Sequence, residues 1–143
     1  MEYKLIIIPL IIVIVTQILK LSIDKIKGNM NLKNIFISYG GMPSAHTAFA
    51  CSITTLAGLH AGLNSIEFAL AAVFTVLIMR DAVTFRNFLG QQGALLNTLV
   101  MKLNMKDQKN TPVFMERVGH SISEVAAGAI WGITSSYILY FFL

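Results

Sequence analysis

The sequence predicts an all-α protein, a polytopic membrane bundle of about four transmembrane helices with one short interfacial or re-entrant helix. Of the 143 residues, 55% are hydrophobic and 13% are charged, and the mean hydropathy is +0.69. This composition is more apolar than a small soluble core requires. The apolar residues also fall into runs of roughly 20, the length that crosses a bilayer as a helix. We therefore expect residues 1–143 to form a single integral membrane domain.

The first two helices are expected over residues 3–23 and 42–63. The first is an uncharged run bounded by Lys4 and Lys20. A cleaved signal peptide is the alternative, but no small-x-small cleavage site follows, so we expect the segment to stay as an anchor. The second carries no formal charge and is rich in Ala, Ser, Thr and Gly, which lets helix backbones approach closely in lipid.

The remaining helices are less regular in polarity. A third is expected to begin near Ile66 and to continue to residue 89, interrupted by Arg80 and Asp81. Residues 90–103 are too short and polar to span comfortably, which predicts the interfacial or re-entrant helix. A polar linker over 104–120 leads into the last helix, 121–143.

Orientation follows from the basic residues. Threading the helices alternately through the membrane leaves Lys4 on one side and gathers the other basic residues on the opposite side, which the positive-inside rule makes cytoplasmic. We therefore expect a multi-pass plasma-membrane protein with both termini outside. The gathered residues are Lys20, Lys25, Lys27, Lys33, Arg80, Arg86, Lys102, Lys106, Lys109 and Arg117.

The same threading brings the unusual polar residues to the cytoplasmic side. "PSAH" opens the second helix there, "RDAVTFR" closes the third, and "GHSISE" opens the last. Ionisable groups at membrane depth are costly and usually functional. This convergence predicts a site at one membrane face.

The stretch "GGMPSAHTA" suits an anion at a helix start. Gly40 and Gly41 permit backbone conformations in which free N–H groups converge, and Pro43 suits a first helical turn. Ser44 can donate a hydroxyl hydrogen bond, and His46 can transfer a proton to a bound group. A simple helix cap with a tolerated histidine explains the same residues.

The stretch "HSISE" predicts that His120 and Glu124 lie one turn apart on one helix face. A carboxylate that binds one imidazole nitrogen leaves the other as a nucleophile or base. Half of a metal site is the alternative, but no third ligand stands at helical spacing, so no metal is expected. His60 falls on the opposite side and is expected to be inert, and Cys51 is expected to be a buried structural thiol.

Cations for a phosphate come from four candidates. Lys20 either snorkels or reaches the site. Arg80 and Arg86 lie about 120° apart around their helix, so at most one should face the site, with Asp81 neutralising the other. Arg117 either reaches the site from the loop or faces anionic headgroups.

Together, "GGMPSAHTA", "RDAVTFRNFLGQQGALLN" and "RVGHSISEV" resemble the divergent bacterial and plant branch of the type 2 phosphatidic acid phosphatase and vanadium-dependent haloperoxidase superfamily. The resemblance implies that His46 protonates the leaving group and that His120 attacks phosphorus, oriented by Glu124. Ala45 stands where the superfamily has glycine, Glu124 replaces aspartate, and Phe114 replaces an arginine. Lys20 and Arg86 are the cations expected to compensate.

The implied activity is metal-independent hydrolysis of a lipid or polyprenyl phosphate monoester, or a pyrophosphate, without a cofactor, through a phosphohistidine. Haloperoxidase chemistry is disfavoured, because those relatives are larger and soluble. One alternative is a non-catalytic protein that binds or transports phospholipid headgroups. Another is a purely structural bundle, in which "GLHAG" and "GAIWG" pair helices, including in a homodimer. Without basic runs interleaved with aromatics, no nucleic-acid partner is expected.

Overall fold

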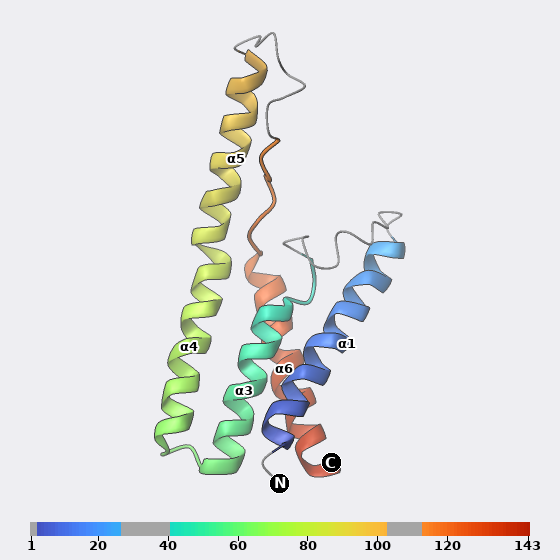
Figure 1. Cartoon of the computed structure of the whole chain (residues 1–143), viewed down its shortest axis with the longest axis vertical. Coiled ribbons are helices and arrows are strands. Elements are labelled where there is room, and N and C mark those ends of the chain that lie inside the picture. Colours follow the sequence, from blue (N-terminus) through green and yellow to red (C-terminus); the bar gives the residue numbers. More distant parts are fainter. Residues whose placement is uncertain (1–2, 27–40, 103–112) are drawn as a thin grey trace.

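The computed structural model describes residues 3–26, 41–102 and 113–143. Every regular element within these ranges is an α-helix. In chain order they are α1 (Lys4–Ile26), α3 (Ala45–Ala61), α4 (Ile66–Val83), α5 (Phe85–Lys102) and α6 (Ile122–Phe142). Four of them run side by side, and α5 extends α4 beyond the bundle (Figure 1). The expected all-α class is confirmed.

Helix α3 is the centre of the bundle and contacts α1, α4 and α6. Its small residues allow this, since Ala48 is fully buried in a core with Ile8, Ile12 and Leu56. Small residues let neighbouring helix backbones approach closely in a membrane, where van der Waals packing drives association. Helix α3 is therefore packed on three sides, which matters because His46 lies in its first turn.

The glycines of "GAIWG" serve the contact between α3 and α6. A Cβ on Gly128 would lie 2.5 Å from the Ser44 carbonyl oxygen, and one on Gly132 would lie 2.3 Å from that of Ala48. In "GLHAG", Gly58 faces Leu63 and Phe68 of its own chain. The glycines of "GAIWG" and Gly58 are thus packed within the chain, whereas a Cβ on Gly62 would meet open space.

Helices α1 and α6 are joined by a polar contact in an otherwise apolar region. The indole Nε1 of Trp131 donates to Thr16 Oγ1 at 3.0 Å, and that hydroxyl donates to the Ile12 carbonyl at 2.6 Å. Thr16 is fully buried. This contact fixes the rotation of α1, and hence the direction in which Lys20 points.

The outside of the bundle is apolar. Large side chains such as Ile6, Leu70, Phe74, Ile130 and Phe141 are more than half exposed. Two helical stretches of the described chain, residues 66–102 and 122–142, are long and apolar enough to cross a membrane. This protein is a helical membrane protein.

Helix α5 differs from the expected re-entrant segment. It begins at Phe85 and continues the direction of α4 rather than folding back (Figure 1). The junction residue Thr84 keeps αR geometry, and its N–H donates to Arg80 O while its carbonyl accepts from Phe88 N. With no glycine or proline between Arg80 and Phe88, nothing breaks the helical hydrogen bonding. The re-entrant alternative is therefore wrong, and the interfacial alternative stays a prediction.

Candidate active site

The start of α3 is built into the bundle. Ser44 is fully buried, its N–H donates to the Glu124 carbonyl at 3.1 Å, and its Oγ accepts from Thr47 at 3.1 Å. Gly41 has φ +100°, and Lys20 Cε lies 3.1 Å from where its Cβ would be. Glycine is therefore required at position 41 for two reasons. The positive φ favours glycine, and a Cβ there would crowd the Lys20 side chain.

The start of α6 corrects the expected His120–Glu124 pair. The helix begins at Ile122 with Ser121 as N-cap, and Glu124 closes a capping box with Ser121. Glu124 Oε2 accepts from Ser121 N at 2.9 Å, Oε1 accepts from Arg117 at 3.2 Å, and the Gly41 N–H also donates to this carboxylate. His120 precedes the helix, so the two residues do not share a helix face. Ser-x-x-Glu is a capping-box sequence, and that signal predicts the observed arrangement.

His120 is held by its backbone. Its N–H donates to Ala82 O at 3.0 Å, and its carbonyl accepts from Asn87 Nδ2 at 3.0 Å. The residue is 4% exposed, and among the described residues its Nδ1 has no hydrogen-bond partner. Buried polar atoms without partners are rare, so this ring nitrogen is a candidate for chemistry.

One face of α5 seats the extended segment that leads to His120. A Cβ on Gly90 would lie 2.3 Å from Glu116 O, and one on Gly93 would lie 2.4 Å from Met115 O. Farther along, the Asn97 side chain donates to Phe114 O and accepts from Phe114 N, both at 2.9 Å. The segment thus lies directly against the helix backbone.

Lys20 and Arg86 lie near both histidines, and Asp81 lies near His46. His46 lies within electrostatic range of Arg86, Lys20 and Asp81, and His120 lies within range of Lys20, His46 and Arg86. Lys20 is 8% exposed. Arg86 Nε donates to Asp81 Oδ2 at 2.6 Å. Residues from α1, α3, the α4–α5 junction and the loop before α6 therefore meet at one place.

The environment of His120 favours the neutral imidazole. Burial is the main cause that lowers the pKa of His120, and the positive charges of Lys20, His46 and Arg86 lower it further, while Glu124 opposes them. Burial and nearby cations both disfavour a protonated ring. A neutral ring retains the lone pair that a nucleophile needs.

Comparison with known proteins gives the family. The sequence model described as "Divergent PAP2 family", where PAP2 denotes type 2 phosphatidic acid phosphatase, matches residues 1–135. The chain belongs to the divergent PAP2 family. It is also 33% identical over 143 residues to "Uncharacterized membrane protein YuiD" of Bacillus subtilis (strain 168), covering 92% of this chain and 90% of that protein. No solved structure matches it significantly.

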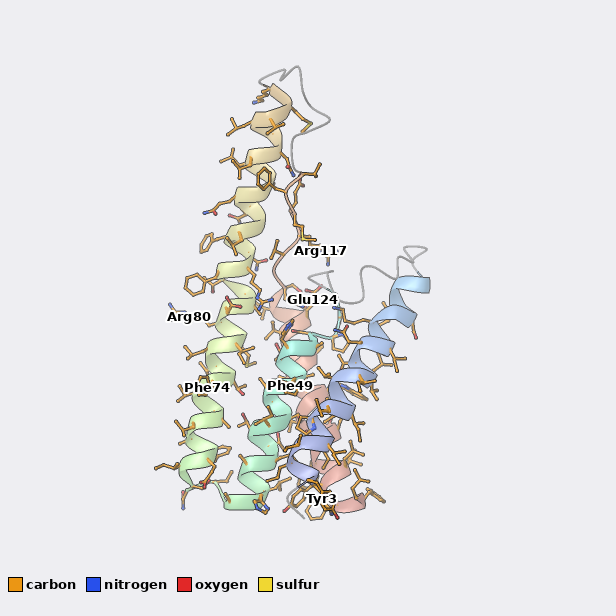
Figure 2. All side chains as sticks on the ribbon, in the orientation of Figure 1. Tyr3, Phe49, Phe74, Arg80, Arg117 and Glu124 are labelled. Atoms are coloured by element: carbon orange, nitrogen blue, oxygen red, sulfur yellow. The ribbon has the colours of Figure 1, made fainter. Side chains whose placement is uncertain are left out.

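A groove of about 560 Å³ adjoins His46 in this divergent PAP2 protein. It lies between α1, α3 and α4, with His46, Asp81 and Arg86 among its lining residues. Phe49 and Phe74, which also line it, lie lower in the bundle than Glu124 (Figure 2). The groove therefore joins charged groups to an apolar surface.

Other candidates lie away from the histidines. The exposed Arg80 points outward from the bundle (Figure 2), so Asp81 pairs with the arginine that lines the groove rather than with the outer one. Arg117 has a side chain that is 77% exposed and contacts Glu124. His60 lies at the far end of α3 and is exposed. Gly40, Lys27, Lys33, Lys106 and Lys109, together with the linker over 104–112, lie outside the described residues.

The sequence analysis missed the residues that seat the segment before His120. Asn87, Gly90, Gly93 and Asn97 recur at spacings of three and four, which places them on one helix face. A stripe of Gly and Asn along one face of the helix was the available signal. It indicates close backbone approach.

Proposed function

We propose that this divergent PAP2 protein is a membrane phosphatase that hydrolyses a lipid phosphate monoester through a phosphohistidine, without a metal ion. One observation carries the proposal. His46 and His120 come from separate helix starts, yet they interact with each other and with the same two cations, Lys20 and Arg86. Preorganised cations stabilise the charge of a phosphoryl group in transfer.

In the first step, a ring nitrogen of His120 attacks phosphorus, forming an N–P bond as the P–O bond to the lipid alcohol breaks. His46 donates its proton to the departing alkoxide. Lys20 and Arg86 neutralise the non-bridging oxygens, and Asp81 orients the Arg86 guanidinium through Nε. A general acid of this kind contributes about 10²- to 10⁴-fold in rate.

In the second step, His46 takes a proton from water as the water oxygen attacks phosphorus. The N–P bond breaks, inorganic phosphate leaves, and His120 returns to its neutral form. Glu124 is a positioning residue in this scheme. Its carboxylate accepts hydrogen bonds from Ser121 N, Arg117 and Gly41 N, and so joins the start of α6 to the residues before α3. Ser44, buried against α6, likewise positions the start of α3.

We further propose a multi-pass arrangement in the plasma membrane with the site at the cytoplasmic face. The basic residues of the two long loops support this orientation through the positive-inside rule. The substrate then comes from the cytoplasmic leaflet. The apolar groove beside His46 supports a lipid rather than a soluble phosphate.

A second candidate is non-catalytic binding of a phospholipid headgroup by the same cations. Phosphate release from lipid phosphates by purified protein separates the two. We expect release that is abolished in His120→Ala, blocked by vanadate and unaffected by a chelator. Lipid binding with no release by the wild-type protein would favour headgroup binding instead.

A further inference from the structure

The groove between α1, α3 and α4 changes in character along its length. Its charged end holds His46, Asp81 and Arg86. Toward the middle of the bundle the walls become Phe49, Phe74 and other apolar side chains. A phosphate at the charged end would thus have its attached chain running into hydrocarbon-lined space.

Helix α1 shows the same change from charged to apolar side chains, one turn at a time. Lys20, Gln17 and Val13 follow at spacings of three and four, so they share a face, and Gln17 and Val13 line the groove. At 1.5 Å per residue, Gln17 lies about 4.5 Å below Lys20 along the helix axis. The order is a cation, then an amide, then an aliphatic side chain.

Gln17 is the unusual residue on the α1 side of the groove. It is half-buried, and within the described residues its side-chain amide makes no hydrogen bond. An amide without partners is costly in an apolar setting, and polar groups at membrane depth usually have a function. Its place below Lys20 points to a polar group of a ligand.

We infer that this groove binds one chain of a lipid phosphate, and that Gln17 hydrogen-bonds an oxygen of that lipid next to its phosphate. This rests on the proposed function. A glycerol phosphate carries hydroxyl or ester oxygens on the carbons that follow the phosphate ester. A polyprenyl phosphate carries only hydrocarbon there and would leave the amide unpaired. The groove therefore selects glycerol-based phosphate monoesters.

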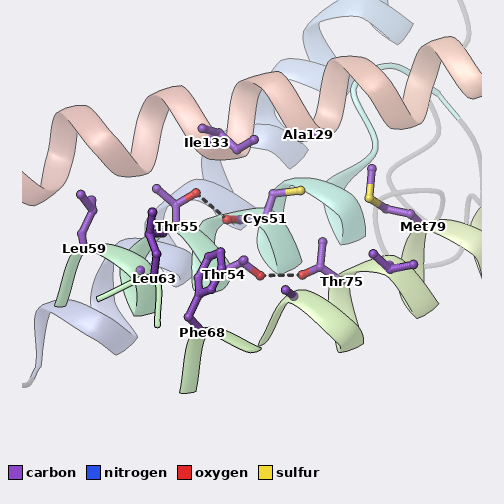
Figure 3. Close-up of a pocket in the computed structure, with 13 residues that line it drawn as sticks. Cys51, Thr54, Thr55, Leu59, Leu63, Phe68, Thr75, Met79, Ala129 and Ile133 are labelled. Atoms are coloured by element: carbon purple, nitrogen blue, oxygen red, sulfur yellow. Dashed lines mark hydrogen bonds between the residues drawn. The ribbon is translucent and has the colours of Figure 1, made fainter. Parts of the chain in front are cut away.

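A second groove on the other side of α3 lacks these features (Figure 3). It lies between α3, α4 and α6 and has a volume of about 590 Å³, and none of the described residues that line it is charged. Its threonine hydroxyls have partners: Thr55 donates to Cys51 O at 2.8 Å, and Thr54 pairs with Thr75 at 2.8 Å. It serves as the matched control.

The test compares two detergent-dispersed substrates with equal chains, a lysophosphatidate and a simple alkyl monophosphate. We expect the wild-type protein to have the higher kcat/KM on the lysophosphatidate. Gln17→Leu should reduce that preference about three- to tenfold, the range of one hydrogen bond, because the lysophosphatidate loses a hydrogen bond that the alkyl phosphate never makes. Thr55→Val, in the second groove, should keep the preference.

Equal wild-type kcat/KM values for the two substrates, or a preference that survives Gln17→Leu, would overturn the inference. Binding separates it from the proposed function. If neither lipid is hydrolysed, the phosphatase proposal fails, but the lysophosphatidate should still raise the Tm of the wild-type protein more than the alkyl phosphate does. Loss of that difference in Gln17→Leu would support the inference, and its persistence would refute it.

Discussion

Adding one methyl group to the α5 face that seats the segment before His120 should lower activity without unfolding the protein. A Cβ on Gly93 would lie 2.4 Å from Met115 O, whereas ordinary contact begins at 3.4 Å, so Gly93→Ala must push the segment away by about 1 Å. His120 follows that segment and is held to α4 and α5 by backbone contacts. A misplacement of about 1 Å costs on the order of 100-fold in rate.

The assay is steady-state phosphate release from a lipid phosphate by purified protein, with kcat and KM determined separately. We expect kcat to fall by about 100-fold and KM to change little, because Lys20 and Arg86 do not lie on the displaced segment. Alanine is a better helix former than glycine by about 1 kcal/mol, so a weaker α5 would not explain the loss.

Gln92→Ala is the matched control, since Gln92 adjoins Gly93 in sequence but is exposed. It should retain wild-type kcat. A wild-type kcat in Gly93→Ala would refute the reasoning that α5 positions His120.

Three further results are expected. Because Lys20 lowers the pKa of His120, Lys20→Met should raise that pKa and move the acid limb of the kcat/KM profile to higher pH; an unmoved limb would contradict the assignment. Gly132→Ala places a Cβ 2.3 Å from a backbone oxygen of α3 and should lower stability by about 1–3 kcal/mol in a denaturation assay, and an unchanged midpoint would argue against that contact. Thr16→Val leaves the Trp131 N–H unpaired and should cost about 1–3 kcal/mol in the same assay, which unaltered stability would disprove.

Helix positions were predictable from the sequence because apolar run length is set by the bilayer. The last helix was expected over 121–143 and lies at Ile122–Phe142. Residues 90–103 were expected to be interfacial or re-entrant because they are short and polar, and no role was assigned to their glycines. Those glycines admit another backbone, and such an approach depends on a partner segment that lies far away in sequence.

The sequence indicated which residues gather at the candidate site better than it indicated the contacts they make there. Threading alone placed His46, His120, Lys20 and several arginines on one side, whereas the choice of Arg86 came with the family resemblance. The role of Glu124 was not predictable, because a capping box and a catalytic pair both require a carboxylate at the start of α6. Gln17 gave no sequence signal, since one amide in an apolar helix is informative only when the groove beside it is known.

The most direct test of the account is to trap the phosphorylated protein. A labelled aryl phosphate, whose leaving group needs little protonation, is mixed with purified protein and quenched in base, which preserves phosphohistidine. The account predicts acid-labile label on His120, none in His120→Asn, and more in His46→Asn because hydrolysis of the intermediate is slowed. Product release by the wild-type protein without labelled His120, or equal label in His120→Asn, would contradict it.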